Sequence, residues 1–185
     1  MIVALTGCAG QPHATREPVR TVVSTVVQLA PEASLTLPLP PGYPQARTLQ
    51  HFVRAQYGAR GGSFEAVLSL SPERVEVVLV APSGPRLASF VWDARAITQE
   101  SAGALLSGAP AQNILGDIFL CFWPIEAVRT ALPDGLEVRE GPDGARTITQ
   151  QGRPIIEISV EGIDARRVHL RNLAFSYQLH IETSP

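Results

Sequence analysis

Lysine is absent from the 185-residue chain, so all 15 of its basic residues are arginines. This absence excludes the lysine of a P-loop, a Schiff-base lysine and a Ser-x-x-Lys nucleophile. Charge is also scarce: charged residues make up 17% of the chain, and its 17 acids leave a formal net charge of −2. We therefore expect no nucleic-acid partner, because binding to phosphates needs clustered cations.

Long apolar runs and cysteines are scarce as well. No stretch reaches the ~18 uncharged apolar residues that a membrane-spanning helix needs. The two cysteines, Cys8 and Cys121, are too few for a disulfide framework or a cysteine zinc site. Disorder is not expected, because 45% of the residues are hydrophobic and the net charge is small. The length suits a single domain.

The N-terminus carries one distinctive pattern. Cys8 follows Leu-Thr-Gly at residues 5–7 and an apolar start, which resembles the lipobox of bacterial lipoproteins. The resemblance implies cleavage before Cys8 and acylation of its thiol, and stable anchoring takes more than one acyl chain. Ala9 after the cysteine implies the periplasmic face of the outer membrane of a Gram-negative bacterium. The apolar stretch is shorter than a signal peptide, so we expect a true start upstream of Met1. The alternative is a chance cysteine near an apolar N-terminus.

Most of the chain predicts β-strands separated by turn signals. Residues 19–29 are β-branched and predict one extended segment, and the five prolines within 31–44 predict a stiff linker or a stretch laid across the surface. Apolar and polar side chains then alternate, as in an antiparallel sheet with one buried face. The expected strands are 48–57, 63–70, 74–81, 86–93, 136–140, 145–150, 153–161, 166–172 and 174–183.

The middle of the chain predicts two helices. Residues 99–110 are small and loosely patterned, and an apolar stripe at helical spacing follows in residues 114–122. Pro124 ends that helix and begins a second one over 124–132, which Pro133-Asp134-Gly135 terminates. Cys121 lies within the stripe, where a free cysteine is usually a small core residue.

These features together resemble a known family. The segment 114–124, Ile-Leu-Gly-Asp-Ile-Phe-Leu-Cys-Phe-Trp-Pro, and the ending 177–181, Tyr-Gln-Leu-His-Ile, resemble a family of uncharacterised predicted outer-membrane lipoproteins whose genes accompany aryl polyene pigment clusters. That family is distantly similar to the lipoprotein carrier LolA and its receptor LolB. The resemblance implies a mainly β (α+β) fold, a curved antiparallel half-barrel of about nine to eleven strands. Two or three short helices would cover its concave face.

The expected organisation has three parts. Residues 1–8 are a signal remnant with the lipobox, 9–44 are a tether with one extended segment and the proline-rich stretch, and 45–185 form the half-barrel. The resemblance implies a non-enzymatic protein that binds or transfers a lipid-like ligand in the periplasm, such as an aryl polyene lipid or a lipoprotein acyl chain. No cofactor or metal is expected.

A lipid site of this kind needs a wide apolar lining and no catalytic residue. The same positions also suit an ordinary filled core. The candidate lining residues come from the apolar faces of the expected strands and first helix: Phe64, Leu68, Leu70, Val75, Val77, Leu79, Phe90, Trp92, Ile118, Phe119, Phe122, Trp123, Ile156, Ile158, Phe175, Tyr177 and Leu179.

Polar residues offer little catalytic or metal chemistry. His51, His169 and His180 are expected on the solvated face of the strands, and Asp117 is expected to cap its helix or pair with an arginine. Zinc-site histidine spacing and a Gly-x-Ser-x-Gly elbow are both missing from the sequence. Two alternatives to lipid binding stay open. One is a structural lipoprotein that docks a membrane-protein partner, and the other is an esterase with a Ser or Cys beside a His.

Overall fold

The computed structural model describes residues 20–101, 111–162 and 166–184. In this part of the chain the fold is mainly β, as expected, with thirteen strands and two helices. The elements are β1 Arg20–Val23, β2 Val26–Ala30, β3 Ala33–Thr36, β4 Arg47–Tyr57, β5 Arg60–Leu70, β6 Arg74–Val80, β7 Arg86–Asp93, β8 Ile97–Ser101, α1 Ala111–Phe122, α2 Ile125–Ala131, β9 Leu136–Glu140, β10 Arg146–Gln150, β11 Arg153–Glu161, β12 Arg167–Asn172 and β13 Tyr177–Thr183.

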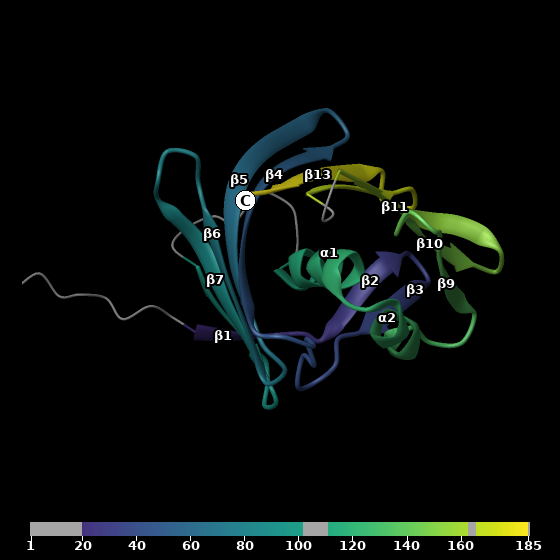
Figure 1. Ribbon diagram of the computed structural model, residues 1–185, viewed down its shortest axis with the longest axis horizontal. Helices are drawn as coiled ribbons and strands as arrows, with labels where there is room; N and C mark the ends of the chain where they lie inside the picture. The colour runs from purple at the N-terminus through teal and green to yellow at the C-terminus, as the bar shows by residue number, and fades with distance from the viewer. Residues whose placement is uncertain (1–19, 102–110, 163–165, 185) are drawn as a thin grey trace, which may run out of the picture.

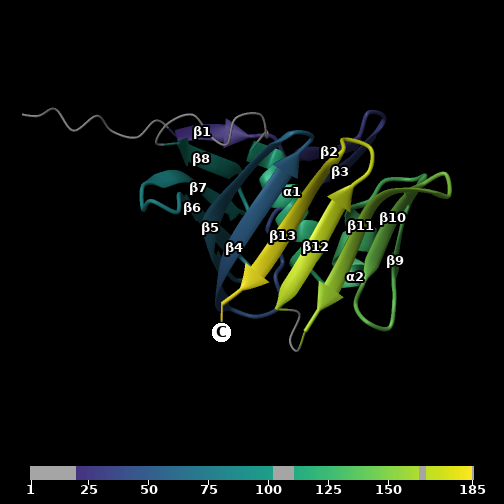
Figure 2. The same cartoon turned by 90° about the horizontal axis from the view of Figure 1, so that it is seen from above.

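Eleven of the strands form one open, curved antiparallel sheet. Its order is β1-β8-β7-β6-β5-β4-β13-β12-β11-β10-β9. Most neighbours are consecutive hairpin strands, and β4 pairs with β13, which joins the two halves of the chain in the middle of the sheet. Figure 2 shows β4, β13, β12 and β11 side by side across the outer face. The open, curved form fits the expected half-barrel.

The remaining elements lie inside the curve of the sheet. Figure 1 shows α1, α2 and the separate β2–β3 hairpin within the concave side. Gly116 of α1 lies against β2: a Cβ added there would be 2.5 Å from Cγ1 of Val27. The Asn172 side chain at the end of β12 donates to the Leu29 carbonyl at 2.9 Å, which ties the hairpin to the sheet. The hairpin therefore packs against both α1 and the second half of the sheet.

Alternating burial confirms the predicted strand pattern. In β6 the buried residues Val75, Val77 and Leu79 alternate with more exposed positions, because successive strand side chains point to opposite faces. On the outer face, cross-strand ion pairs join Arg54 to Glu182 and other arginines to their opposite glutamates. The few charges of the chain are thus placed mostly on one side of the sheet.

Two stretches of the predicted outline are wrong. Residues 20–30 form two strands, not one, and β1 pairs with β8 over part of the segment expected to be loose. The proline-rich stretch is not a surface linker: β3 lies in it, and Leu35 and Leu37 are buried. From residue 20 onward, the expected tether therefore packs with the sheet. Residues 102–110 of the loose segment lie outside the described part.

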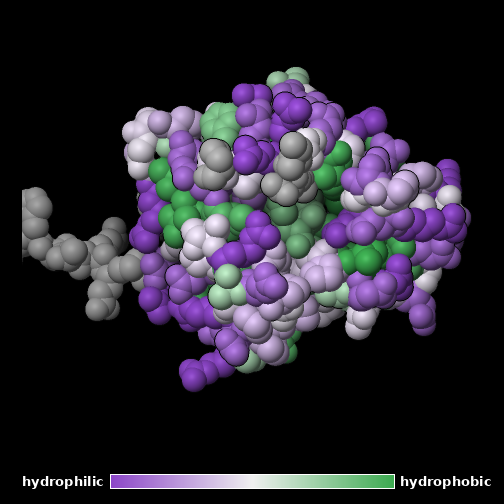
Figure 3. All heavy atoms as spheres, viewed as in Figure 1, coloured by the Kyte–Doolittle hydropathy of each residue, from purple (hydrophilic) through white to green (hydrophobic). Residues whose placement is uncertain are grey.

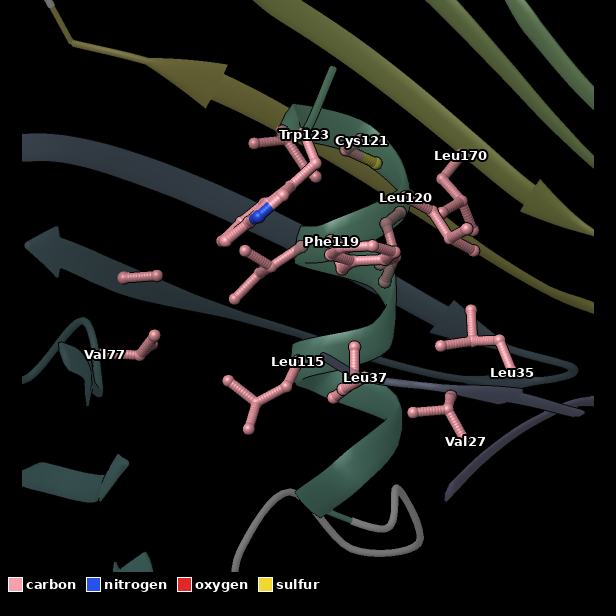
Figure 4. Close-up of a cluster of buried hydrophobic side chains, with 14 of the residues drawn as sticks. Val27, Leu35, Leu37, Val77, Leu115, Phe119, Leu120, Cys121, Trp123 and Leu170 are labelled. Atoms are coloured by element: carbon pink, nitrogen blue, oxygen red, sulfur yellow. The ribbon is translucent and has the colours of Figure 1, made fainter. Parts of the chain in front are cut away.

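Two indole groups hold the proline-rich stretch in place. Nε1 of Trp92 donates to the Pro38 carbonyl and Nε1 of Trp123 donates to the Pro41 carbonyl, each at 2.7 Å. The two indole rings stack with centroids 5.3 Å apart, and Phe119 lies beside both. Figure 4 shows α1 among aliphatic side chains from the hairpin and the sheet. Buried indole N–H groups need acceptors, and the proline carbonyls provide them.

The last strand starts later than predicted. Residues 173–176 form a turn, and β13 begins at Tyr177. The Asn172 side-chain oxygen accepts from the Phe175 backbone N–H at 2.7 Å, and Ser176 has a φ of 54°. An Asn side chain that bonds its own backbone a few residues on favours a turn over a strand.

Among the described residues, neither helix has the length and apolar character needed to cross a membrane.

Candidate functional site

An apolar cavity lies between one face of α1 and the middle of the sheet. Strands β4, β5, β6 and β13 form its sheet side, and α1 forms the opposite side. Figure 3 shows hydrophobic residues gathered between the β5–β7 strands and α1. The lining residues are His51, Val53, Tyr57, Phe64, Ala66, Leu68, Leu79, Ile114, Asp117, Ile118, Phe122, Leu179 and Ile181.

The cavity is narrow and almost wholly apolar. Its volume is about 40 Å³, which is enough for on the order of three water molecules. Ten of the thirteen lining residues are hydrophobic, and the polar ones are His51, Tyr57 and Asp117. The cavity is therefore too small for a whole acyl chain.

The predicted lining residues fall into three groups. Six of them line the cavity: Phe64, Leu68, Leu79, Ile118, Phe122 and Leu179. Ten others are buried elsewhere in the core: Leu70, Val75, Val77, Phe90, Trp92, Phe119, Trp123, Ile156, Ile158 and Tyr177. Phe175 lies in the turn before β13 and is 40% exposed, so its placement on the inner face is wrong.

Asp117 is buried in the cavity wall, 6% exposed, and pairs with no arginine among the described residues. The Tyr177 hydroxyl donates to its Oδ1 at 2.7 Å, and the Tyr177 ring stacks on Tyr57. Burial raises the pKa of the Asp117 carboxyl from 3.8 to about 7. Burial and the nearby carboxyl raise the pKa of Tyr57 to about 12. The expected cap or arginine pair for Asp117 is wrong, because its helical face is covered by the sheet.

His51 contributes the second buried polar group of the cavity. It is 2% exposed and stacks on Phe122 with ring centroids 4.7 Å apart, so its predicted place on the solvated face is wrong. Its Nδ1 lies 3.0 Å from the Thr183 hydroxyl, while Nε2 has no partner in the part of the chain that is described. Burial, with the nearby Arg47 charge, lowers the pKa of His51 from 6.5 to about 4, so the ring is neutral at pH 7.

The sequence contains signals for both missed residues. His51 lies two residues from each of the buried residues Leu49 and Val53 along β4, and residues two apart in a strand share a face. Asp117 follows Ile114 by three residues, and this spacing places two residues on one helical face. A polar residue on an otherwise apolar face was the available signal in each case.

A second, larger hollow adjoins the cavity at Phe122, which lines both. Its volume is about 310 Å³, and it contains two arginines, Arg47 and Arg146. Arg146 is held by Glu140, with Nε to Oε2 at 2.7 Å, and its Nη1 donates to the Leu120 carbonyl at 2.8 Å. The other lining residues are Tyr43, Pro44, Gln45, Trp123 and Pro124. The hollow thus has a cationic and aromatic character that the cavity lacks.

Other candidates for chemistry do not join these sites. His169 and His180 face each other across β12 and β13, with rings stacked 4.0 Å apart. Over residues 20–101, 111–162 and 166–184, no three His, Cys, Asp or Glu side chains gather as metal ligands would. Within the same ranges, His51 is bonded to the Thr183 hydroxyl, and no hydrogen bond joins a histidine to a Ser or Cys. Cys121 is buried, which raises the pKa of its thiol.

Cys8 and its lipobox-like setting lie outside the described residues.

No curated protein matches the chain. One family model, "Protein of unknown function (DUF3261)", matches residues 48–185. The matched region includes every strand and helix that lines the cavity. The chain therefore belongs to the DUF3261 family.

Proposed function

We propose that this protein binds a lipid-like hydrophobic ligand between α1 and the concave face of the sheet. The observation that carries the proposal is the apolar cavity, with ten hydrophobic lining residues in the middle of an open, curved sheet. Ligand sites are typically concave and mostly apolar with few polar groups. Such a site suits a largely apolar ligand, such as the aryl polyene lipid or lipoprotein acyl chain that the sequence resemblance implies.

Binding of such a ligand requires an opening of the fold. Burial of a chain of sixteen carbons would contribute on the order of 10 kcal/mol, at ~0.8 kcal/mol per methylene. The cavity, at about 40 Å³, is too small to bury such a chain. The ligand must therefore displace α1, and part of the gain offsets the loss of α1 contacts and the ordering of the ligand. Because Gly116 lies close against Val27 of the hairpin, we propose that α1 stays with the hairpin and separates from the sheet.

We also propose that acylation of Cys8 anchors the protein to the outer membrane, so that the ligand site lies in the periplasm. Its support is the lipobox-like sequence around Cys8. The test is the mass of the N-terminal peptide from protein made with its native leader in a Gram-negative host. We expect an acylated peptide in the outer-membrane fraction, and a soluble protein after Cys8→Ala. An unmodified Cys8 peptide would contradict the anchor without bearing on the cavity.

The test of ligand binding fills the cavity. Ala66 lies on the inner face of β5 and lines the cavity, and Ser69 lies exposed on the outer face of the same strand. We expect the wild type to take up the uncharged dye N-phenyl-1-naphthylamine, Ala66→Leu to take up much less, and Ser69→Leu to match the wild type. Thermal unfolding of both variants checks that the fold is retained.

Equal uptake by Ala66→Leu and the wild type would show that the dye binds elsewhere and would contradict the proposed site. No uptake by the wild type, of dye or of fluorescent fatty acid, would contradict lipid binding itself.

A second candidate is a structural lipoprotein that docks a membrane-protein partner without a ligand. The small cavity volume, about 40 Å³, favours it, because a filled core needs no ligand. Its distinguishing result is an empty protein that cross-links to one membrane protein through an end strand of the sheet, β1 or β9.

A further inference from the structure

The cationic hollow beside Trp123 and Pro124 opens next to the apolar cavity. Phe122 lines both spaces, and its ring stacks on His51, a residue of the cavity wall. An elongated molecule that passes Phe122 therefore occupies an arginine-lined space at one end and an apolar space at the other. Acidic side chains are missing from the described lining of the hollow.

The fold holds Arg146 in place before any ligand arrives, whereas Arg47 is exposed and has one weak side-chain contact. Nη1 of Arg47 lies 3.4 Å from the Tyr43 hydroxyl, and the Tyr43 ring packs edge-on against Trp123. Arg146 has a side chain only 12% exposed and is fixed by Glu140 and a backbone carbonyl. Preorganised donors lose little entropy when they bind an anion, and a guanidinium has five N–H donors.

The charge balance of the hollow favours an anion. Glu140 neutralises one of the two guanidinium groups, so the pair and this acid leave a net charge of +1. Arg47 has no carboxylate partner among the described residues. Arg47 lies on the same face of β4 as His51 of the cavity wall, and its charge is the smaller cause of the lowered pKa of that ring.

We infer that Arg47 and Arg146 form a head-group site for an anionic, single-chain amphiphile, with its carboxylate or phosphate in the hollow and its chain past Phe122 in the cavity. The inference rests on the proposed lipid binding and adds the ligand's charge and orientation. A charge-assisted hydrogen bond contributes ~1.5–3 kcal/mol, and the lower end of this range is a factor of about ten in affinity.

The experiment compares three amphiphiles of one chain length: tetradecanoate and tetradecyl phosphate, each below its micelle concentration, and tetradecanol below its solubility limit. Each displaces N-phenyl-1-naphthylamine from the full-length protein. We expect both anions to bind about tenfold more tightly than the alcohol, and the preference to weaken in high salt. Arg47→Gln removes the preference and leaves tetradecanol unchanged. Arg60→Gln, an exposed arginine on β5 outside the hollow, keeps the preference.

The two anions distinguish a carboxylate from a phosphate ligand by which binds more tightly. The head-group site would be overturned if the wild type bound the alcohol as tightly as both anions. It would also be overturned if Arg47→Gln still preferred the anions to the alcohol. Lipid binding would stand in either case. No binding of any probe to the wild type would overturn both. Arg47 is exposed and makes few contacts, so Arg47→Gln is expected to fold, and its unfolding temperature confirms this.

Discussion

Replacement of Asp117 by Asn makes the stability of the protein depend differently on pH. The folded state holds the Asp117 carboxyl at a pKa of about 7, against its usual value of 3.8. Between these two pH values the unfolded chain loses the proton while the folded chain keeps it. Folding stability therefore falls as pH rises through this window. Asn cannot ionise and retains a side-chain oxygen that accepts from the Tyr177 hydroxyl.

The size of the effect follows from the pKa difference. One pKa unit corresponds to ~1.4 kcal/mol, so the shift of Asp117 costs the wild type about 4 kcal/mol at pH 8 relative to pH 4. His51 acts with the opposite sign, because its pKa is lowered from 6.5 to about 4. Its contribution is present above pH 6.5 and is lost as pH falls towards 4, by about 3 kcal/mol. Comparison with Asp117→Asn isolates the aspartate, because both proteins contain His51.

The assay is urea unfolding of both proteins from pH 4 to pH 8, followed by tryptophan fluorescence. We expect the free energy of unfolding of Asp117→Asn, minus that of the wild type, to grow from pH 4 to about pH 7 and then level off. A difference that stays constant across the range would refute the reasoning, because it would mean that the carboxyl ionises as it does in water.

Three further predictions concern the core. Trp123→Phe leaves the Pro41 carbonyl without its donor and is expected to cost about 2 kcal/mol of stability, measured by urea unfolding; an unchanged free energy would contradict the role of this bond. Gly116→Ala places a Cβ against Val27 and is expected to lower the unfolding temperature, whereas the added change Val27→Ala restores part of it; a loss that Val27→Ala does not reduce would contradict this contact. Cys121 is buried with a raised thiol pKa, so maleimide is expected to label it only in denaturant, and rapid labelling of the native protein would contradict its burial.

The hairpin arms of the fold could be predicted because their signals are local. The break between the predicted strands 145–150 and 153–161 falls at Gln151-Gly152, whose positive φ angles of 51° and 76° suit a tight hairpin. Strands with clear alternation, such as β6 and β7, lie within a residue of their predicted bounds. Each of these pairings joins neighbours in the sequence, so the alternation and the turn residues together determine it.

The missed elements depend on partners far away in the sequence. β1 pairs with β8 about eighty positions later, and no local pattern in either short strand indicates that pairing. The proline-rich stretch reads as a linker because prolines donate no backbone hydrogen bond. Its carbonyls still accept from Trp92 and Trp123, and this interaction leaves no mark on the sequence nearby.

The apolar part of the site was easier to predict than its polar part. Six of the predicted residues lie along the cavity, because an apolar face indicates the inside of the sheet. Which inward residues line a cavity, and which fill the core, depends on how closely α1 approaches each strand. His51 is predicted on the solvated face and Asp117 as a helix cap or arginine partner because their residue types are usually exposed, although their spacing indicates the buried face.

The most direct test of lipid binding is native mass spectrometry of the protein purified from the membranes of a Gram-negative host, followed by extraction of what it carries. The account predicts a stoichiometric adduct with the mass of one single-chain amphiphile, which the cavity-filling change Ala66→Leu removes. A protein that is always empty, and that takes up no added fatty acid, would contradict it.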